Sequence, residues 1–137
     1  MLLSLLEKGF ARGKDLNCAE TILYGANEAY KLGLDKDSLK LSSGFGGGMG
    51  IEDTCGAVAG SVMVLGRIFV KDRAHESGKL KQITAEFLNA YRQEMGSINC
   101  APLKEKYRDD LRGCEDVIFK AAEILDQVIE EYQDHPV

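Results

Sequence analysis

CGAVAGSVMVLG, residues 55–66, is a run of twelve residues without a single charge. Its side chains are small or apolar all round, so a helix built from it presents no polar face to water. Such a helix is stable where other helices surround it. The run therefore predicts the central helix of a bundle, continuing to Phe69, with residues 57–65 almost fully buried. Gly56 and Gly60, four residues apart on one face, would let a neighbouring helix approach closely.

Helical periodicity recurs on both sides of this run, whereas the strict alternation typical of a β-strand does not. Apolar stripes with helical spacing occupy residues 2–10, 19–30, 80–95 and 117–132. A chain of 137 residues has the length of one ordinary domain, and neither a repeat nor a linker divides it. The sequence predicts an all-α fold, a single-domain helical bundle over residues 1–137 with a buried central helix.

Charge and hydropathy argue against two classes of partner. The net charge is −5, and the Lys and Arg residues are scattered among acids, which disfavours nucleic acid. The longest uncharged run is far shorter than the ~20 residues of a membrane span, so we expect no membrane insertion. The first residues lack the basic region of a signal peptide, and Glu7 interrupts their apolar run. We expect a cytoplasmic protein; its partner proteins and its oligomeric state, a homodimer included, stay open.

Each of the four cysteines lies at the expected start of a helix, although their spacing along the chain follows no known motif. No two form a CxxC pair, which excludes a zinc ribbon, a thioredoxin motif and a c-type haem site. Each lies where a helix is expected to begin, after a residue that suits a helix start: Asn17 before Cys18, Thr54 before Cys55, Asn99 before Cys100 and Gly113 before Cys114. Unpaired backbone N–H groups and the helix dipole favour a thiolate there. In a reducing cytoplasm, such cysteines are expected to be catalytic or metal-binding, the simpler alternative being four buried, inert side chains.

A glycine-rich run, GFGGGMG at residues 44–50, precedes Cys55. It matches neither the Rossmann fingerprint nor the Walker loop. We expect it to make room beside a sulfur and to direct backbone N–H donors toward it, stabilising a thiolate or tuning a cluster. The residues predicted to line a cofactor in this way are Gly46, Gly47, Gly48 and Gly56. If the site is a dithiol, Cys55 is expected to be the cysteine most available as thiolate, because the buried helix start and the glycine N–H donors lower its pKa, provided that Glu52 and Asp53 turn toward water.

Several of these segments together resemble the C_GCAxxG_C_C family, whose members are described as redox-active. The segments are, in order, NCAETIL (residues 17–23), FGGGMG (45–50), CGAVAGSVMVLG (55–66), GSINC (96–100) and a last cysteine opening the C-terminal helix. The resemblance covers nearly the whole chain. It implies a helical fold and a redox role, with the four defining positions at Cys18, Cys55, Cys100 and Cys114. Family members occur mostly in anaerobic bacteria and archaea, often near transporter genes, and no reaction is established for them.

Two redox interpretations follow, and two of another class. The four cysteines hold an iron–sulfur cluster, or they form a thiol/disulfide couple that needs no metal. Alternatively, the chain is a non-enzymatic module with a structural zinc site, or an accessory protein that senses metal or thiol status for a transporter. Whether the protein is an enzyme stays open. Each redox interpretation requires Cys18, Cys55 and at least one of Cys100 and Cys114 to lie close together.

Overall fold

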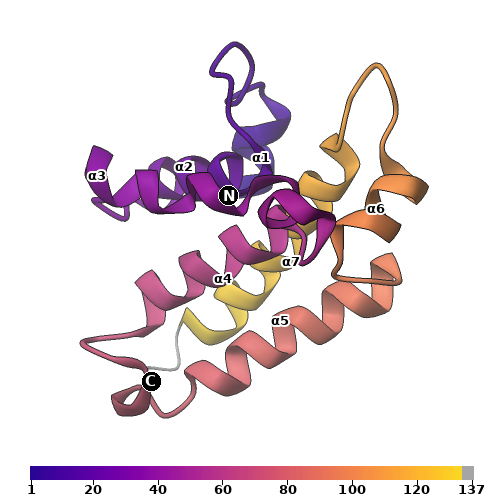
Figure 1. Ribbon diagram of the computed structural model, residues 1–137. Helices are drawn as coiled ribbons and strands as arrows, with labels where there is room; N and C mark the ends of the chain where they lie inside the picture. Colours follow the sequence, from indigo (N-terminus) through magenta and orange to yellow (C-terminus); the bar gives the residue numbers. More distant parts are fainter. Residues whose placement is uncertain (134–137) are drawn as a thin grey trace.

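The structure, a computed structural model, describes residues 1–133 and confirms the all-α fold (Figure 1). Within these residues no strand occurs, and no helix is both long and apolar enough to cross a membrane. The α-helices are α1 (Leu2–Glu7), α2 (Cys18–Ala29), α3 (Lys36–Leu39), α4 (Gly56–Phe69), α5 (Leu80–Met95), α6 (Cys100–Tyr107) and α7 (Glu115–Gln133). Shorter helical turns or tight loops occupy Lys40–Phe45, Gly48–Glu52 and Ala74–Glu76.

The uncharged run forms α4, which lies in the middle of the bundle and packs against α2, α5 and α7 (Figure 1). Its buried residues are Gly56, Ala57, Val58, Gly60, Ser61, Val64 and Leu65. The hydroxyl of Ser61 donates to the carbonyl of Ala57 at 2.8 Å, so its polar group is satisfied inside the core. The prediction that residues 57–65 are almost fully buried is wrong in part. Ala59, Val62 and Met63 stay partly exposed, because the covering helices leave one side of α4 open.

Gly60 lies at a close approach of α2 and α4. A Cβ atom at this position would lie 2.8 Å from the carbonyl oxygen of Ala19 and 3.2 Å from Cβ of Ile22. Both are closer than ordinary van der Waals contact, and the first is a backbone atom that cannot turn aside. The predicted close approach of a neighbouring helix at a glycine of α4 is therefore confirmed.

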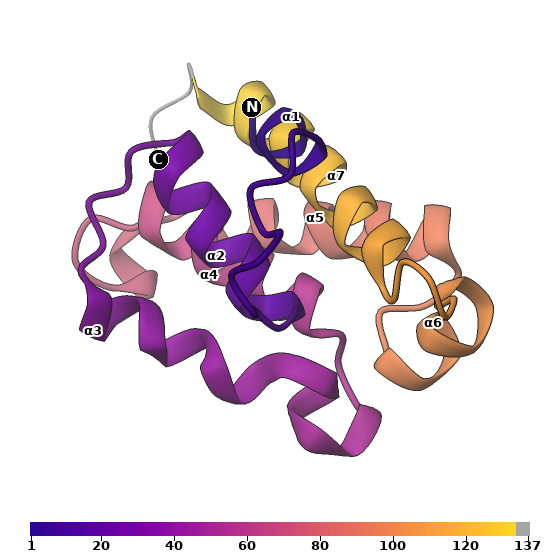
Figure 2. The same cartoon turned by 90° about the horizontal axis from the view of Figure 1, so that it is seen from above.

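The first helix is capped by a residue far away in the chain. α1 has no side-chain cap of its own, and it lies along α7 (Figure 2). There the carboxylate of Asp126 accepts from the backbone N–H groups of Leu2 at 3.0 Å and Leu3 at 2.9 Å, and from the hydroxyl of Tyr30. One carboxylate thus joins α1, α2 and α7.

Replacing Asp126 by alanine is expected to lower the free energy of unfolding by about 1–3 kcal/mol, because four donors, the ammonium group of Met1 included, lose their acceptor at once. Urea denaturation of the parent and the variant measures the difference. The matched control is Asp37→Ala, whose side chain is 90% exposed in an ion pair with Lys40, and which should change stability by less than about 0.5 kcal/mol. Equal losses in the two variants would show that the carboxylate of Asp126 does not cap α1.

Candidate functional site

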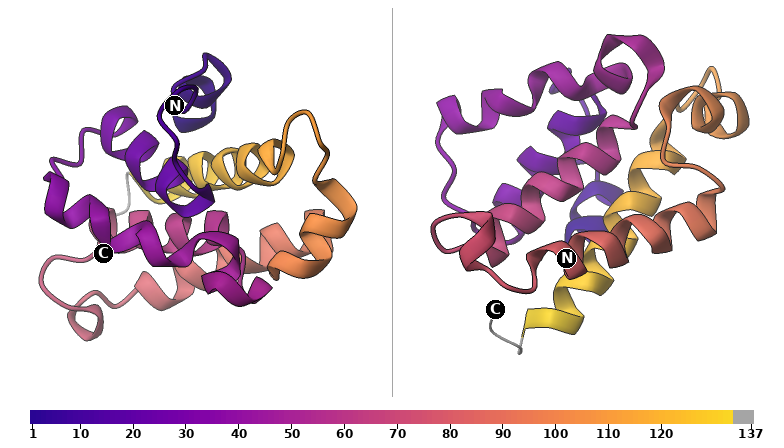
Figure 3. Two further views of the ribbon diagram at one scale, coloured as in Figure 1. Left: turned by 45° about the horizontal axis from the view of Figure 1, so that its top comes forward. Right: turned by 60° about the horizontal axis from the view of Figure 1, so that its bottom comes forward.

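The four cysteines all lie at helix starts, as the sequence predicts. Cys18 and Cys100 are the first residues of α2 and α6, Cys55 is the N-cap of α4, and Cys114 directly precedes α7. The starts of α4, α6 and α7 gather at one end of the molecule (Figure 3). Four helix N-termini therefore carry the thiols.

Local signals fix the start of α2. The side chain of Asn17 accepts from the backbone N–H of Glu20 at 2.9 Å, and the carboxylate of Glu20 accepts from the backbone N–H of Asn17 at 2.9 Å. This reciprocal pair is the predicted capping box, and it sets the backbone direction at Cys18.

At α4 the expected cap is wrong, because a contact between distant segments replaces it. Thr54 does not cap the helix; it forms an isolated antiparallel bridge with Asn99. On either side of this bridge, the N–H of Cys55 donates to the carbonyl of Ile98 at 2.8 Å and the N–H of Cys100 donates to that of Asp53 at 2.6 Å. The bridge therefore ties the starts of α4 and α6, and with them two cysteines, to one place.

All four cysteines line one small cavity of about 20 Å³, together with Gly56, Leu103, Lys104 and Val117. That volume holds about one water molecule. The thiol of Cys18 raises the pKa of each of the other three cysteines, which marks Cys18 as their common neighbour. The structure thus brings together side chains that are 14 to 96 residues apart in the chain.

The expectation of a lowered pKa at Cys55 is wrong. Its side chain is 4% exposed, and burial raises the pKa of the thiol to about 11. The backbone N–H groups of Val58 and Ala57 act in the opposite direction, without completing a capping hydrogen bond. Glu52 and Asp53 do turn toward water as expected. Loss of hydration of the thiolate in the packed interior therefore outweighs the helix start.

The other two perturbed thiols lie nearer to solvent and beside cations. Burial raises the pKa of Cys100 and of Cys114, whereas Lys104 lowers the pKa of both and Arg108 lowers that of Cys114. Lys104 also forms an ion pair with Glu52 at 3.0 Å. Neither Lys104 nor Arg108 was expected at this site from the sequence. The available signal was their spacing, since they follow Cys100 by one and two turns of helix.

Three of the four glycines of the candidate site make space, each for a different neighbour. A Cβ at Gly56 would lie 2.5 Å from Sγ of Cys18, and one at Gly48 would lie 2.7 Å from Cβ of Cys100. At Gly46 it would lie 2.5 Å from Cγ of Asn17, whereas at Gly47 it would meet no atom within 4 Å. The donors that act on Cys55 belong to the first turn of α4 and not to this loop. A cofactor-binding role of these glycines stays a prediction.

Tyr91 is a further residue of the site. From the sequence it was expected only as a member of the apolar stripe at residues 80–95. It is fully buried, its hydroxyl donates to the carbonyl of Val117 at 3.3 Å, and it also contacts the thiol of Cys55. Burial, and after it the charge of Cys55, raises the pKa of Tyr91. No feature of the sequence separates this tyrosine from a core residue.

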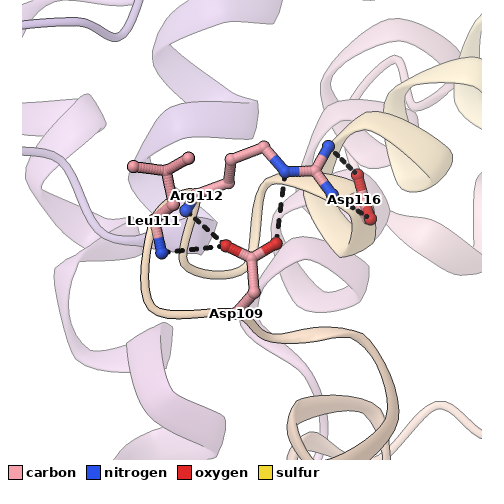
Figure 4. A network of polar contacts seen from close by, with 4 residues as sticks. All are labelled: Asp109, Leu111, Arg112 and Asp116. Atoms are coloured by element: carbon pink, nitrogen blue, oxygen red, sulfur yellow. Dashed lines mark hydrogen bonds and ion pairs between the residues drawn. The ribbon is translucent and has the colours of Figure 1, made fainter.

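A polar network fixes the loop that leads to Cys114 (Figure 4). The carboxylate of Asp109 accepts from the backbone N–H groups of Leu111 at 2.9 Å and Arg112 at 2.6 Å, and from Nε of Arg112 at 3.2 Å. The two terminal nitrogens of Arg112 donate to Asp116 in α7 at 3.1 and 3.2 Å. The guanidinium therefore holds the loop against the first turn of α7.

The donor set is four sulfurs, the ligand type that both zinc and iron–sulfur clusters prefer. All four are free thiols. As their side chains lie, no three or more His, Cys, Asp or Glu of residues 1–133 are arranged so that they could hold a metal ion. The residues thus fit a metal centre by chemistry, and binding would require proton loss and a closer approach of the sulfurs.

Without metal, the protein is expected to lose stability as the pH rises from about 9 to about 11. Cys55 holds its proton more tightly when folded, with a pKa of about 11 against 9.0, so unfolding releases protons in this window. The free energy of unfolding should fall by about 2–3 kcal/mol. Urea titrations at several pH values measure it, and Cys55→Ala should have a shallower decline. Identical declines would show that the thiol is not buried as described.

Residues 16–128 match the model of a protein family described as "Putative redox-active protein (C_GCAxxG_C_C)". The match includes all four cysteines and the box at residues 55–60. Neither the curated proteins nor the solved structures gave a match.

Proposed function

The chain belongs to the C_GCAxxG_C_C family of proteins described as redox-active, and on this premise we propose that it is an electron-transfer protein whose four cysteines hold an iron–sulfur cluster. The observation that carries the proposal is the convergence of Cys18, Cys55, Cys100 and Cys114 on one cavity from four helix starts. A dithiol needs two cysteines, whereas a four-sulfur centre needs all of them. Such a cluster, when bound, supplies one-electron chemistry.

The electrostatics support an anionic centre at this place. Each helix N-terminus stabilises negative charge by about 0.3–1 kcal/mol, and by up to ~2 kcal/mol when partly buried. Lys104 lines the same cavity and adds a positive charge, which it shares with Glu52. These groups oppose the mutual repulsion of four thiolates, which burial alone would make prohibitive.

The burial of Cys55 favours a ligand over an exchanging thiol. With a pKa of about 11 it is almost entirely protonated at neutral pH, so it attacks a disulfide poorly. A metal removes the proton of a coordinating thiol outright. Tyr91 and the surrounding apolar side chains would exclude water and orient this sulfur. Zinc would suit the same ligands, but it has no redox chemistry.

A thiol/disulfide couple is the second candidate, and two observations favour it. The cavity of about 20 Å³ is small, and Cys18 neighbours each of the other thiols. In this mechanism the thiolate of Cys114, beside Arg108 and Lys104, attacks a disulfide of a partner protein and releases one partner thiolate. The thiolate of Cys18 then attacks the mixed disulfide. This step forms Cys18–Cys114 and releases the second partner thiol, so the partner is reduced as this chain is oxidised.

Metal analysis of protein purified without oxygen tests both candidates. Iron and inorganic sulfide in equal amounts, a brown colour and a paramagnetic signal after one-electron reduction or oxidation are expected for the cluster. A colourless protein whose free thiol count falls reversibly by two on oxidation would instead establish the couple. One zinc per chain with no redox change would overturn both and establish the structural module.

The proposed location of the protein is the cytoplasm, where thiols stay reduced. Its proposed partner is a protein that exchanges electrons with the four-cysteine centre. A transporter-associated sensing role would show itself as a metal or thiol content that follows the medium. Size-exclusion chromatography with light scattering would decide whether the protein is a homodimer.

A further inference from the structure

A second, larger pocket opens beside the four-cysteine cavity. It has a volume of about 220 Å³ and lies between α1 with its following loop, α2 and the start of α7. Cys114 lines both this pocket and the four-cysteine cavity. A molecule bound here would therefore touch a residue of the redox site without entering the site itself.

The size and walls of this pocket suit a small organic molecule. A protein cavity of ~150 Å³ is large enough to hold benzene. Here Leu6, Ile118 and Phe119 supply an apolar wall. An occupant with an apolar body of medium size would remove this surface from water, which favours binding.

The charged residues of the pocket indicate which charged groups a bound molecule should carry. Its charged lining residues are Arg12, Arg112 and Glu115. Arg112 is neutralised by Asp109 and Asp116 (Figure 4). Within residues 1–133, neither Arg12 nor Glu115 forms an ion pair. One cation and one anion are thus left to meet an occupant.

We propose that this pocket binds a zwitterionic α-amino acid with a medium-sized apolar side chain. Its carboxylate pairs with Arg12, its ammonium group pairs with Glu115, and its side chain packs against Leu6, Ile118 and Phe119. Arg12 is exposed and Glu115 is half-buried. A zwitterion brings an opposite charge to each of them, whereas a simple carboxylate or amine brings one and a neutral occupant brings none. The zwitterion satisfies both. This site goes beyond the redox function and does not depend on it.

Calorimetry with L-leucine as the probe tests the proposal on the protein as isolated. Leucine is expected to bind, and 4-methylpentanoate and 3-methylbutylamine, which each lack one charged group, are expected to bind about tenfold more weakly or worse. Arg12→Gln and Glu115→Gln should each weaken leucine binding by a similar factor. The matched controls are Arg73→Gln and Glu28→Gln, two exposed residues outside the pocket, and these should bind leucine as the parent does.

Three results would overturn the proposal. They are no binding of leucine at millimolar concentration, equal affinity for leucine and its singly charged analogues, and unchanged affinity in both pocket variants. Circular dichroism of each variant checks that the fold is intact. Leucine binding in a protein that holds no cluster and forms no disulfide would support the amino-acid site and refute the proposed redox function. A failure of the amino-acid site can thus be distinguished from a failure of the redox function.

Discussion

Replacing Gly60 by leucine is expected to lower the free energy of unfolding by about 3 kcal/mol, at the upper end of the usual cost of overpacking. Even the first added carbon would lie 2.8 Å from the carbonyl oxygen of Ala19. Because this atom belongs to the backbone of α2, the strain is relieved only by moving the two helices apart. Urea denaturation measures the effect.

Gly66 provides the matched control on the same helix. A Cβ atom there would meet no other atom within 4 Å, so Gly66→Leu should leave stability within about 1 kcal/mol of the parent. The comparison removes the general effect of placing leucine in α4, where glycine itself is unfavourable. A Gly60→Leu protein as stable as Gly66→Leu would contradict the tight α2–α4 contact.

Replacing Cys55 by serine is expected to abolish iron binding, with the iron content per chain falling to background after anaerobic purification. The buried thiol is one of four ligands in the proposed centre, and a serine hydroxyl is a poor substitute for a thiolate at iron. Elemental analysis and visible absorption measure the loss. The control is Ala59→Ser, which places a hydroxyl on a partly exposed side of the same helix and should keep its iron.

The two redox candidates make different predictions for the same variants. If the centre is a thiol/disulfide couple of Cys18 and Cys114, then Cys55→Ser should retain the reversible loss of two thiols. Cys18→Ser should lose it. Unchanged metal content and unchanged thiol chemistry in Cys55→Ser would leave this cysteine with a packing role alone.

Gly56 shows how closely packing and site are joined in this fold. It is the first residue of α4 and lines the four-cysteine cavity, where an added Cβ would collide with Sγ of Cys18. The sequence explains part of this, because it identifies a glycine on the face of α4 that a neighbouring helix approaches. The identity of the neighbour, a cysteine 38 positions earlier, depends on the packing of α2 against α4.

Features that depend on neighbours along the chain follow from the amino-acid sequence alone. The periodicity of apolar residues determines which segments are helical, and the uncharged run determines which helix lies at the centre. Asn17 and Glu20 determine the start of α2, since both hydrogen bonds of the capping box join residues three apart. The helix-start position of Cys18 follows from this capping box, whereas the starts of α4 and α6, which carry Cys55 and Cys100, have no side-chain cap.

Other features depend on contacts between segments that are far apart in the sequence, and these follow from the tertiary packing. Thr54 bridges to Asn99 instead of capping α4, and Asp126 caps α1 from the other end of the chain. The pKa of Cys55 is raised because packed helices remove water from its thiol, an effect that opposes and exceeds the local helix start. The apolar periodicity predicts which face of a helix is buried, but it does not predict which residues pack against that face. Those residues determine how deeply the cysteines are buried and which charges lie near them.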